Sequence, residues 1–217
     1  MGAREAGGLR DPERSEGYRC EAGVPLRSNK IYNQNTEEGL GMIGFFSEVP
    51  ELSGERIILR HISMKDAEAL QSFAHDEEVY RYLPTFLFEQ RYSDARTVIE
   101  RLYTECMEES LILGIYMDDS FAGLAELYGF RDPIHKVSIG YRLAKEYWGR
   151  GIATETVRIL VDYLYGSTDI EIITASTLPE NHASENVLQK NDFQLVVSGS
   201  DEDWGYPEML PTDKWIR

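Results

Sequence analysis

A predicted strand, a glycine-containing turn and an amphipathic helix follow one another between residues 136 and 165. The turn contains Gly149 and Gly151. The helix, expected from about 152 to 165, places four apolar residues on one face: Val157, Leu160, Val161 and Leu164. Glycine permits turns that point several N–H groups inward, and a helix start adds unpaired N–H groups and a positive dipole end. Such a turn either binds a pyrophosphate or merely redirects the chain, and these residues alone leave both interpretations open.

The rest of the chain predicts a mixed domain. Apolar periodicity and turn residues indicate strands at 56–62, 111–117, 121–128, 136–143, 170–175, 193–197 and 209–216. Two helices are expected to begin near Ser63 and Ser93, a third covers about 152–165 and ends at Gly166, and a fourth covers about 183–190. The order β-α-α-β-β-β-α-β-α-β-β is typical of an α+β fold, with helices flanking a mostly antiparallel central sheet.

Residues 1–41 are rich in Gly, Glu and Arg and show no sustained period of 2 or 3.6. We expect a disordered N-terminal extension followed by one domain over 52–217. Met42 precedes the first apolar patterning, and the sequence leaves open whether translation starts at Met1 or Met42. The run 39–44 matches the dinucleotide pattern G-x-G-x-x-G. A polar stretch precedes this run and Pro50 follows closely, so we expect no nucleotide site there.

The net charge of −16 limits the expected partners. An acidic surface repels the phosphate backbone, so we do not expect nucleic acid to bind. It attracts cations, including amines, although an acidic surface also serves solubility alone. No apolar run approaches the roughly 20 residues of a membrane span, and no apolar secretory signal is found. Cys20 and Cys106 have no metal or redox spacing, so we expect no metal site and a reduced, cytoplasmic chain.

Three blocks resemble the GNAT superfamily of N-acetyltransferases, most closely its branch of ribosomal-protein-alanine N-acetyltransferases. Residues 148–153, Trp-Gly-Arg-Gly-Ile-Ala, are similar to the superfamily loop Gln/Arg-x-x-Gly-x-Gly/Ala, with Trp148 first as is usual in this branch. Residues 179–193 resemble the branch's Pro-Glu-Asn-x-x-Ser…Lys-x-Gly-Phe run, with Asp192 in place of Gly. Residues 55–60 resemble its first strand. The resemblance implies a GNAT fold over 52–217 and acetyl-CoA as the acyl donor.

The resemblance also implies where acetyl-CoA binds. Its pyrophosphate is expected on the amides of the loop and first helical turn: Gly149, Arg150, Gly151, Ile152, Ala153 and Thr154. The pantetheine arm is expected along the backbone of Tyr141, Arg142 and Leu143, where the Leu143 amide polarises the acyl carbonyl. Asn181 is expected to hydrogen-bond the pantetheine. Asn181 also has the residue type and position of a helix cap, and the two roles are compatible.

The implied reaction is direct attack of an amine on the thioester. Amines are mostly protonated at neutral pH, so a base must accept a proton. Glu126, an acid among apolar strand residues, is the candidate base; the alternative is an exposed or salt-bridged strand residue. Many GNAT enzymes carry a tyrosine as the acid seven residues after the asparagine, where this chain has Leu188. Ser184, expected to face the thioester sulfur, is then the remaining side-chain donor.

The resemblance leaves several matters open. The acceptor is an amine, and protein N-termini, polyamines and other small amines all fit. A homodimer is one possible assembly. The main alternative function is a non-catalytic module that binds or senses acyl-CoA, which the missing tyrosine permits. A self-associating structural domain is a third class.

Overall fold

The computed structural model describes residues 49–217 except residue 109. The predicted extension over 1–41, the glycine run 39–44 and Met42 lie outside these residues. The strands are β1 (Leu52–Ser53), β2 (Ile57–Arg60), β3 (Ser110–Met117), β4 (Ser120–Arg131), β5 (Lys136–Leu143), β6 (Ile172–Thr177), β7 (Gln194–Glu202) and β8 (Leu210–Ile216). The α-helices are α1 (Ala67–Ala74), α2 (Glu77–Tyr80), α3 (Ala95–Leu102), α4 (Ile152–Ser167) and α5 (His182–Lys190).

All eight strands form one sheet, in the order β1-β2-β3-β4-β5-β6-β8-β7. Neighbouring strands are antiparallel except β5 and β6, which are parallel. The predicted α+β class with a mixed, mostly antiparallel sheet is therefore confirmed. Within the described part of the chain, no helix has the length and apolar character needed to cross a membrane.

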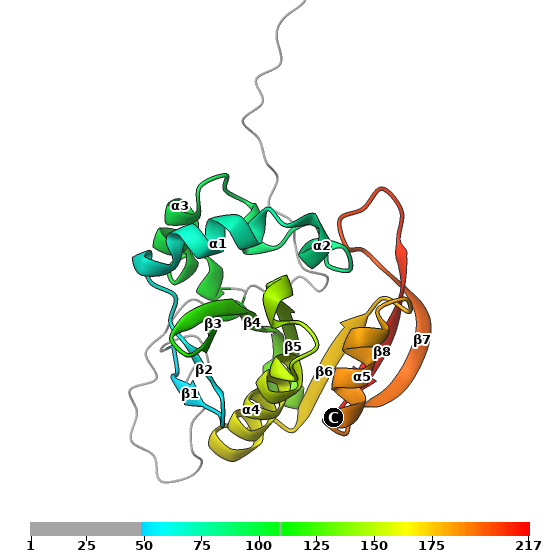
Figure 1. Ribbon diagram of the computed structural model, residues 1–217. Coiled ribbons are helices and arrows are strands. Elements are labelled where there is room, and N and C mark those ends of the chain that lie inside the picture. The colour runs from blue at the N-terminus through cyan, green and yellow to red at the C-terminus, as the bar shows by residue number, and fades with distance from the viewer. Residues whose placement is uncertain (1–48, 109) are drawn as a thin grey trace, which may run out of the picture. The chain divides into compact units, whose positions relative to one another are not determined.

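Helices cover both faces of the sheet (Figure 1). Successive side chains of a strand point to opposite faces, so β3 contributes to two cores. Leu111 and Leu113 pack in the core that includes α4, whereas Ile112 packs in the core of α1 and α3. The predicted apolar face of α4 is confirmed, because its four residues are all buried.

Several boundaries differ from the predictions. The helix expected to begin near Ser93 covers Ala95–Leu102 and has Asp94, not Ser93, as its N-cap: the chain is extended at Asp94, whose carboxylate accepts a hydrogen bond from the Arg96 amide at 3.2 Å. Helix α4 passes through Gly166 and ends at Ser167, where the Thr168 hydroxyl donates to the Leu164 carbonyl. Strand β6 begins two residues later than predicted. The short elements β1 and α2 were not predicted, because neither is long enough to show a period.

The sheet divides between β5 and β6. These strands pair over only three positions, Lys136 with Ile172, Val137 with Ile173 and Ser138 with Thr174. Beyond them β6 pairs with β8, and residues 139–143 of β5 pair only with β4. Figure 1 shows β5 and β6 diverging from this point. The second half of β5 therefore has an open edge inside the sheet, where the backbone N–H and C=O groups face no neighbouring strand.

Candidate active site

The open edge of β5 presents backbone donors. The Ala144 amide donates to the Ala122 carbonyl of β4 at 2.9 Å. Because backbone groups alternate in direction along a strand, the N–H and C=O groups of Tyr141 and Leu143 point away from β4, toward the open edge. The Trp148 indole N–H donates to the Leu143 carbonyl at 2.7 Å. This contact satisfies the Leu143 carbonyl and leaves the Leu143 amide as a donor for an extended ligand lying along β5.

The glycine loop is shaped to receive an anion. Gly149 and Gly151 have φ of +69° and +77°, a left-handed conformation that other residues rarely adopt. A Cβ atom at Gly149 would have no neighbour within 4 Å, so the loop is open there. The N-cap of α4 is Gly151, which has no side chain to cap the helix. The first hydrogen bond of the helix runs from the Glu155 amide to Gly151, so the amides of residues 152–154 have no partner within the helix.

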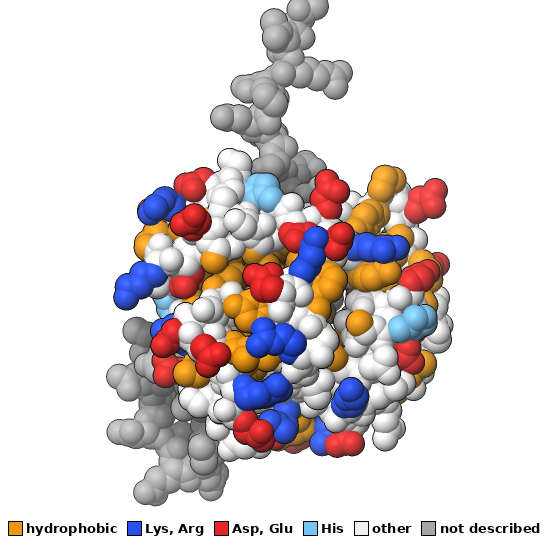
Figure 2. All heavy atoms as spheres, viewed as in Figure 1, with side chains coloured by type: hydrophobic (Ala, Val, Ile, Leu, Met, Phe, Trp, Pro, Cys, Tyr) orange, Lys and Arg blue, Asp and Glu red, His pale blue; other side chains and the backbone are white. Residues whose placement is uncertain are grey.

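Arg56 fixes this loop from the neighbouring segment. Its Nη1 donates to the Arg150 carbonyl at 2.8 Å, and its Nε lies 2.8 Å from an oxygen of Glu155. The Arg56 amide donates to the other Glu155 oxygen at 2.7 Å. Burial would raise the pKa of Glu155, but the hydrogen bonds from Arg56 outweigh it and lower the pKa. Glu155 therefore remains ionised but paired next to the proposed phosphate site. Figure 2 shows Lys and Arg side chains over α4.

Helix α5 begins beside the open edge. Asn181 is its N-cap, and the side-chain oxygen accepts a hydrogen bond from the Ser184 amide at 3.2 Å. The interpretation of Asn181 as a cap is therefore confirmed, and the cap uses the side-chain oxygen, not the nitrogen. Ser184 is half-buried on the first turn, whereas Leu188 is 1% exposed and packs in the core. The position at which the resemblance would place a proton-donating tyrosine is thus part of the apolar core in this chain.

The Tyr141 hydroxyl is buried and interacts with the Ser184 side chain, although it forms no hydrogen bond of good geometry within the described residues. Burial raises the pKa of Tyr141 to about 12, and the interaction with Ser184 offsets part of this effect. The contact brings together Tyr141 of β5 and Ser184 of α5, two of the residues predicted for the site.

Glu126 lies on the other face of the sheet. It is opposite Gly140 of β5, and its side chain, 14% exposed, contacts Arg142 with a distance of 2.9 Å between Oε2 and Nη1. Glu126 is therefore a salt-bridged strand residue, as the alternative interpretation stated. Gly140 faces Glu126 across the strand pair and has no side chain to fill the space between Glu126 and the open edge of β5.

Arg142 connects Glu126 to a buried acid. Its Nε and Nη2 atoms lie 2.5 and 2.6 Å from the two oxygens of Glu89, in the 3₁₀ turn Phe88–Gln90. Tyr80 donates to Glu89 at 2.8 Å. Burial alone would lower the pKa of Arg142, but the carboxylates of Glu89 and Glu126 raise it well above its ordinary value. Glu89 was missed in the sequence, because the segment around it has no period and its partner is 53 residues away.

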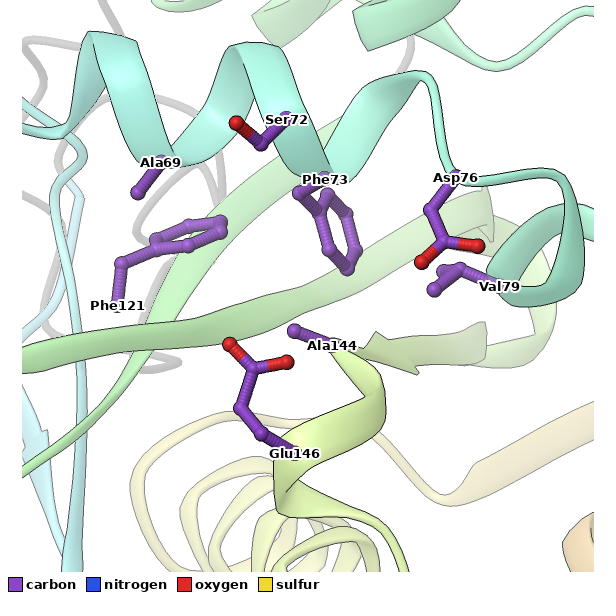
Figure 3. Close-up of a pocket in the computed structure, with 8 residues that line it drawn as sticks. All are labelled: Ala69, Ser72, Phe73, Asp76, Val79, Phe121, Ala144 and Glu146. Atoms are coloured by element: carbon purple, nitrogen blue, oxygen red, sulfur yellow. The ribbon is translucent and has the colours of Figure 1, made fainter.

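Two small hollows lie near these residues. One, of about 170 Å³, is bounded by the end of α1, Phe121 and the turn at Ala144 and Glu146 (Figure 3). It contains none of the predicted site residues. A larger one of about 410 Å³ lies beside α2 and includes Tyr80 and Tyr206. Among the residues described, no group of His, Cys, Asp or Glu has the arrangement of a metal site.

Residues 56–194 match the family described as the acetyltransferase (GNAT) domain. The chain is 30% identical over 150 residues to the uncharacterised N-acetyltransferase YoaA of Bacillus subtilis (strain 168), covering 67% of this chain and 83% of YoaA. It is 26% identical over 169 residues to the putative ribosomal N-acetyltransferase YdaF of the same organism, covering 72% and 92%. The fold is similar to that of Mycobacterium smegmatis RimJ in complex with CoA-disulfide, with a TM-score of 0.66 and 20% identity over 80% of this chain and 88% of RimJ.

These findings confirm the predicted superfamily, the enzyme class and, at the level of the family, acetyl-CoA as the acyl donor. The matched segment covers more than half of the chain and contains β5, the glycine loop, α4 and α5. The chain belongs to the GNAT family of acetyltransferases.

Proposed function

We propose that this chain transfers an acetyl group from acetyl-CoA to a primary amine, which attacks the thioester directly. The observation that carries the proposal is the divided sheet. The glycine loop and α5 lie on one face at the open edge of β5, and Glu126 lies on the other. The two reactants then approach from opposite faces and meet along β5.

The binding roles follow from the unpaired groups of the site. The amides of residues 149–154 bind the pyrophosphate, with the positive end of the α4 dipole behind them. The Tyr141 and Leu143 backbones hydrogen-bond the pantetheine as a neighbouring strand would, and the side-chain nitrogen of Asn181 donates to it. Acetyl-CoA supplies an activated acetyl thioester.

The catalytic roles fall to few groups. Glu126 accepts the proton of the ammonium group, directly or through a water molecule. The Leu143 amide donates to the acyl oxygen and stabilises the negative charge that develops there. Ser184 donates a hydrogen bond to the departing sulfur, since the usual tyrosine is Leu188.

The acceptor is a primary amine, and a protein N-terminus is the first candidate to test. The name of one relative, the putative ribosomal N-acetyltransferase YdaF, supports this choice. A screen of N-terminal peptides, polyamines and small amines with acetyl-CoA, read by release of free thiol, identifies the acceptor. Binding of acetyl-CoA without transfer to any amine would instead support the non-catalytic module. A cytoplasmic location and a homodimer remain predictions.

The role of Glu126 is tested by Glu126→Gln. We expect turnover to fall roughly 10²-fold or more, because the amide accepts no proton, while acetyl-CoA affinity stays the same. The defect is expected to shrink as the pH rises toward the pKa of the acceptor amine, since solution then supplies free amine. Steady-state rates over a pH series measure both effects. Glu68→Gln, an exposed acid on α1, is the control. Wild-type turnover in Glu126→Gln at neutral pH would remove this residue from the mechanism.

A further inference from the structure

Three charged side chains form a buried cluster whose charges do not balance. Arg142 and Glu89 have side chains only 3% and 1% exposed, and Glu126 completes the set at 14%. One guanidinium faces two carboxylates, so the cluster carries one surplus negative charge when both acids are ionised. An unbalanced charge is expensive to bury. The surplus lies closest to solvent on Glu126, the most exposed of the three side chains.

The two acids do not share Arg142 equally. Glu89 takes two parallel hydrogen bonds, at 2.5 and 2.6 Å, and a third from Tyr80. Glu126 takes a single hydrogen bond at 2.9 Å. Bidentate pairing of arginine with a carboxylate is the stronger arrangement. The positive charge of Arg142 is therefore mostly balanced by Glu89.

We propose that Glu89 is a positioning residue, which balances Arg142 so that Glu126 is held in place but still accepts a proton. This inference rests on the proposed role of Glu126 as the base. An arginine alone beside a carboxylate at about 3 Å strongly favours the ionised form and weakens the carboxylate as a base. With Glu89 present, Arg142 orients Glu126 through one hydrogen bond, while Glu89 balances most of the positive charge of Arg142.

The other groups that face Glu126 do not set this balance. Tyr128 on the same strand and Cys106 on the turn Cys106–Glu108 both interact with its charge. Burial raises the pKa of both groups, that of Cys106 to about 12, so each is neutral at physiological pH. Arg91 also acts on Cys106, and Glu202 also acts on Tyr128.

The test is the pH profile of kcat/KM in Glu89→Gln. Glutamine leaves the whole charge of Arg142 to Glu126, so we expect the acidic limb to move to lower pH by roughly one unit. Turnover at neutral pH is expected to fall about threefold, because the rate changes by only part of any change in the strength of the base. Tyr80→Phe is the matched control: it removes a hydrogen bond to Glu89 but keeps all three charges, so its limb should stay at the wild-type pH.

A double variant separates charge from packing. In Glu89→Gln with Arg142→Gln, Glu126 faces no guanidinium, so the acidic limb should return to the wild-type pH or lie above it. This variant carries the test by itself if Glu89→Gln does not fold. An acidic limb unchanged in Glu89→Gln, or a low-pH limb that persists in the double variant, would overturn the inference. Glu126→Gln distinguishes failure of this inference from failure of the proposed function. If Glu126→Gln keeps the wild-type pH profile, Glu126 is not the base. If Glu126→Gln loses the acidic limb, Glu126 is the base and only the role of Glu89 is overturned.

Discussion

Gly151 combines two requirements in one residue. It is the N-cap of α4 with φ of +77°, and the Cβ atom of any other residue would lie 3.3 Å from the Arg56 Nη2 atom. A side chain would therefore strain the backbone and press on the arginine that fixes the loop. Asp192 shows the opposite case. It has φ of +60° at the position where the family usually carries glycine, and aspartate is among the residues that tolerate this conformation.

We expect Gly151→Val to weaken acetyl-CoA binding roughly tenfold or more, because a strained loop no longer turns its amides toward the phosphates. Calorimetry measures the affinity, and a thermal melt checks the fold. Gly166→Val is the control, since Gly166 lies in the same helix, has ordinary φ and would meet nothing within 4 Å. Wild-type affinity in Gly151→Val would locate the phosphates elsewhere.

At the scale of elements, the sequence predicts what is encoded locally. The β5 strand, the glycine loop, α4 and α5 have clear periods and caps, and all were predicted close to their observed bounds. The part of the site contributed by 84–92 was not predicted. Glu89 is held by Arg142, and Thr85 by the Trp204 carbonyl 119 residues away. Contacts of this kind leave no local pattern, so the sequence indicated Glu126 and Arg142 as candidates but not Glu89, which pairs with Arg142.

The Arg56–Glu155 pair makes a testable link between the residue before β2 and helix α4. Glu155 is 3% exposed, so Arg56→Met removes the charged partner of a buried carboxylate and leaves its hydrogen bond from the Arg56 amide. We expect a loss of about 1–3 kcal/mol of unfolding free energy at neutral pH, moderated because Arg56 itself is half-exposed. The pKa of Glu155 is lowered in the folded state, so this stabilisation is present above its unfolded pKa and is lost as the pH falls through its folded pKa.

Urea unfolding from neutral into acidic pH measures the effect. The difference between wild type and Arg56→Met should be largest at neutral pH and disappear in acid. Arg158→Met is the control. Arg158 lies on the same helix as Glu155 and forms an exposed ion pair with Glu55. Loss of this pair should lower the unfolding free energy by less than about 1 kcal/mol. A difference for Arg56→Met that persists in acid would attribute the loss to packing of the arginine side chain instead of to its charge.

At the scale of the whole molecule, the described residues already contain one sheet, two apolar cores and helices on both faces. A chain beginning at Met42 is therefore expected to keep its melting temperature within about 2 °C and its turnover, since nothing in 1–41 has the pattern of a core segment. A chain beginning at Gly54, which lacks the β1 strand paired with β2, should melt lower. A large loss of stability in the Met42 chain would show that the extension is part of the fold.

The three-residue ladder between β5 and β6 has a consequence for how this fold tolerates change. Unpaired strand edges are usually blunted or covered in natural proteins, because they favour aggregation. Here such an edge is kept inside the sheet, and in the proposed function it is the binding surface. Substitutions that lengthened the ladder would pair these backbone groups and raise stability, while removing the place where the reactants meet. A substitution in these few residues of β5 that raises stability is therefore expected to lower activity. Consensus substitutions meant to stabilise the chain should be made outside this part of β5.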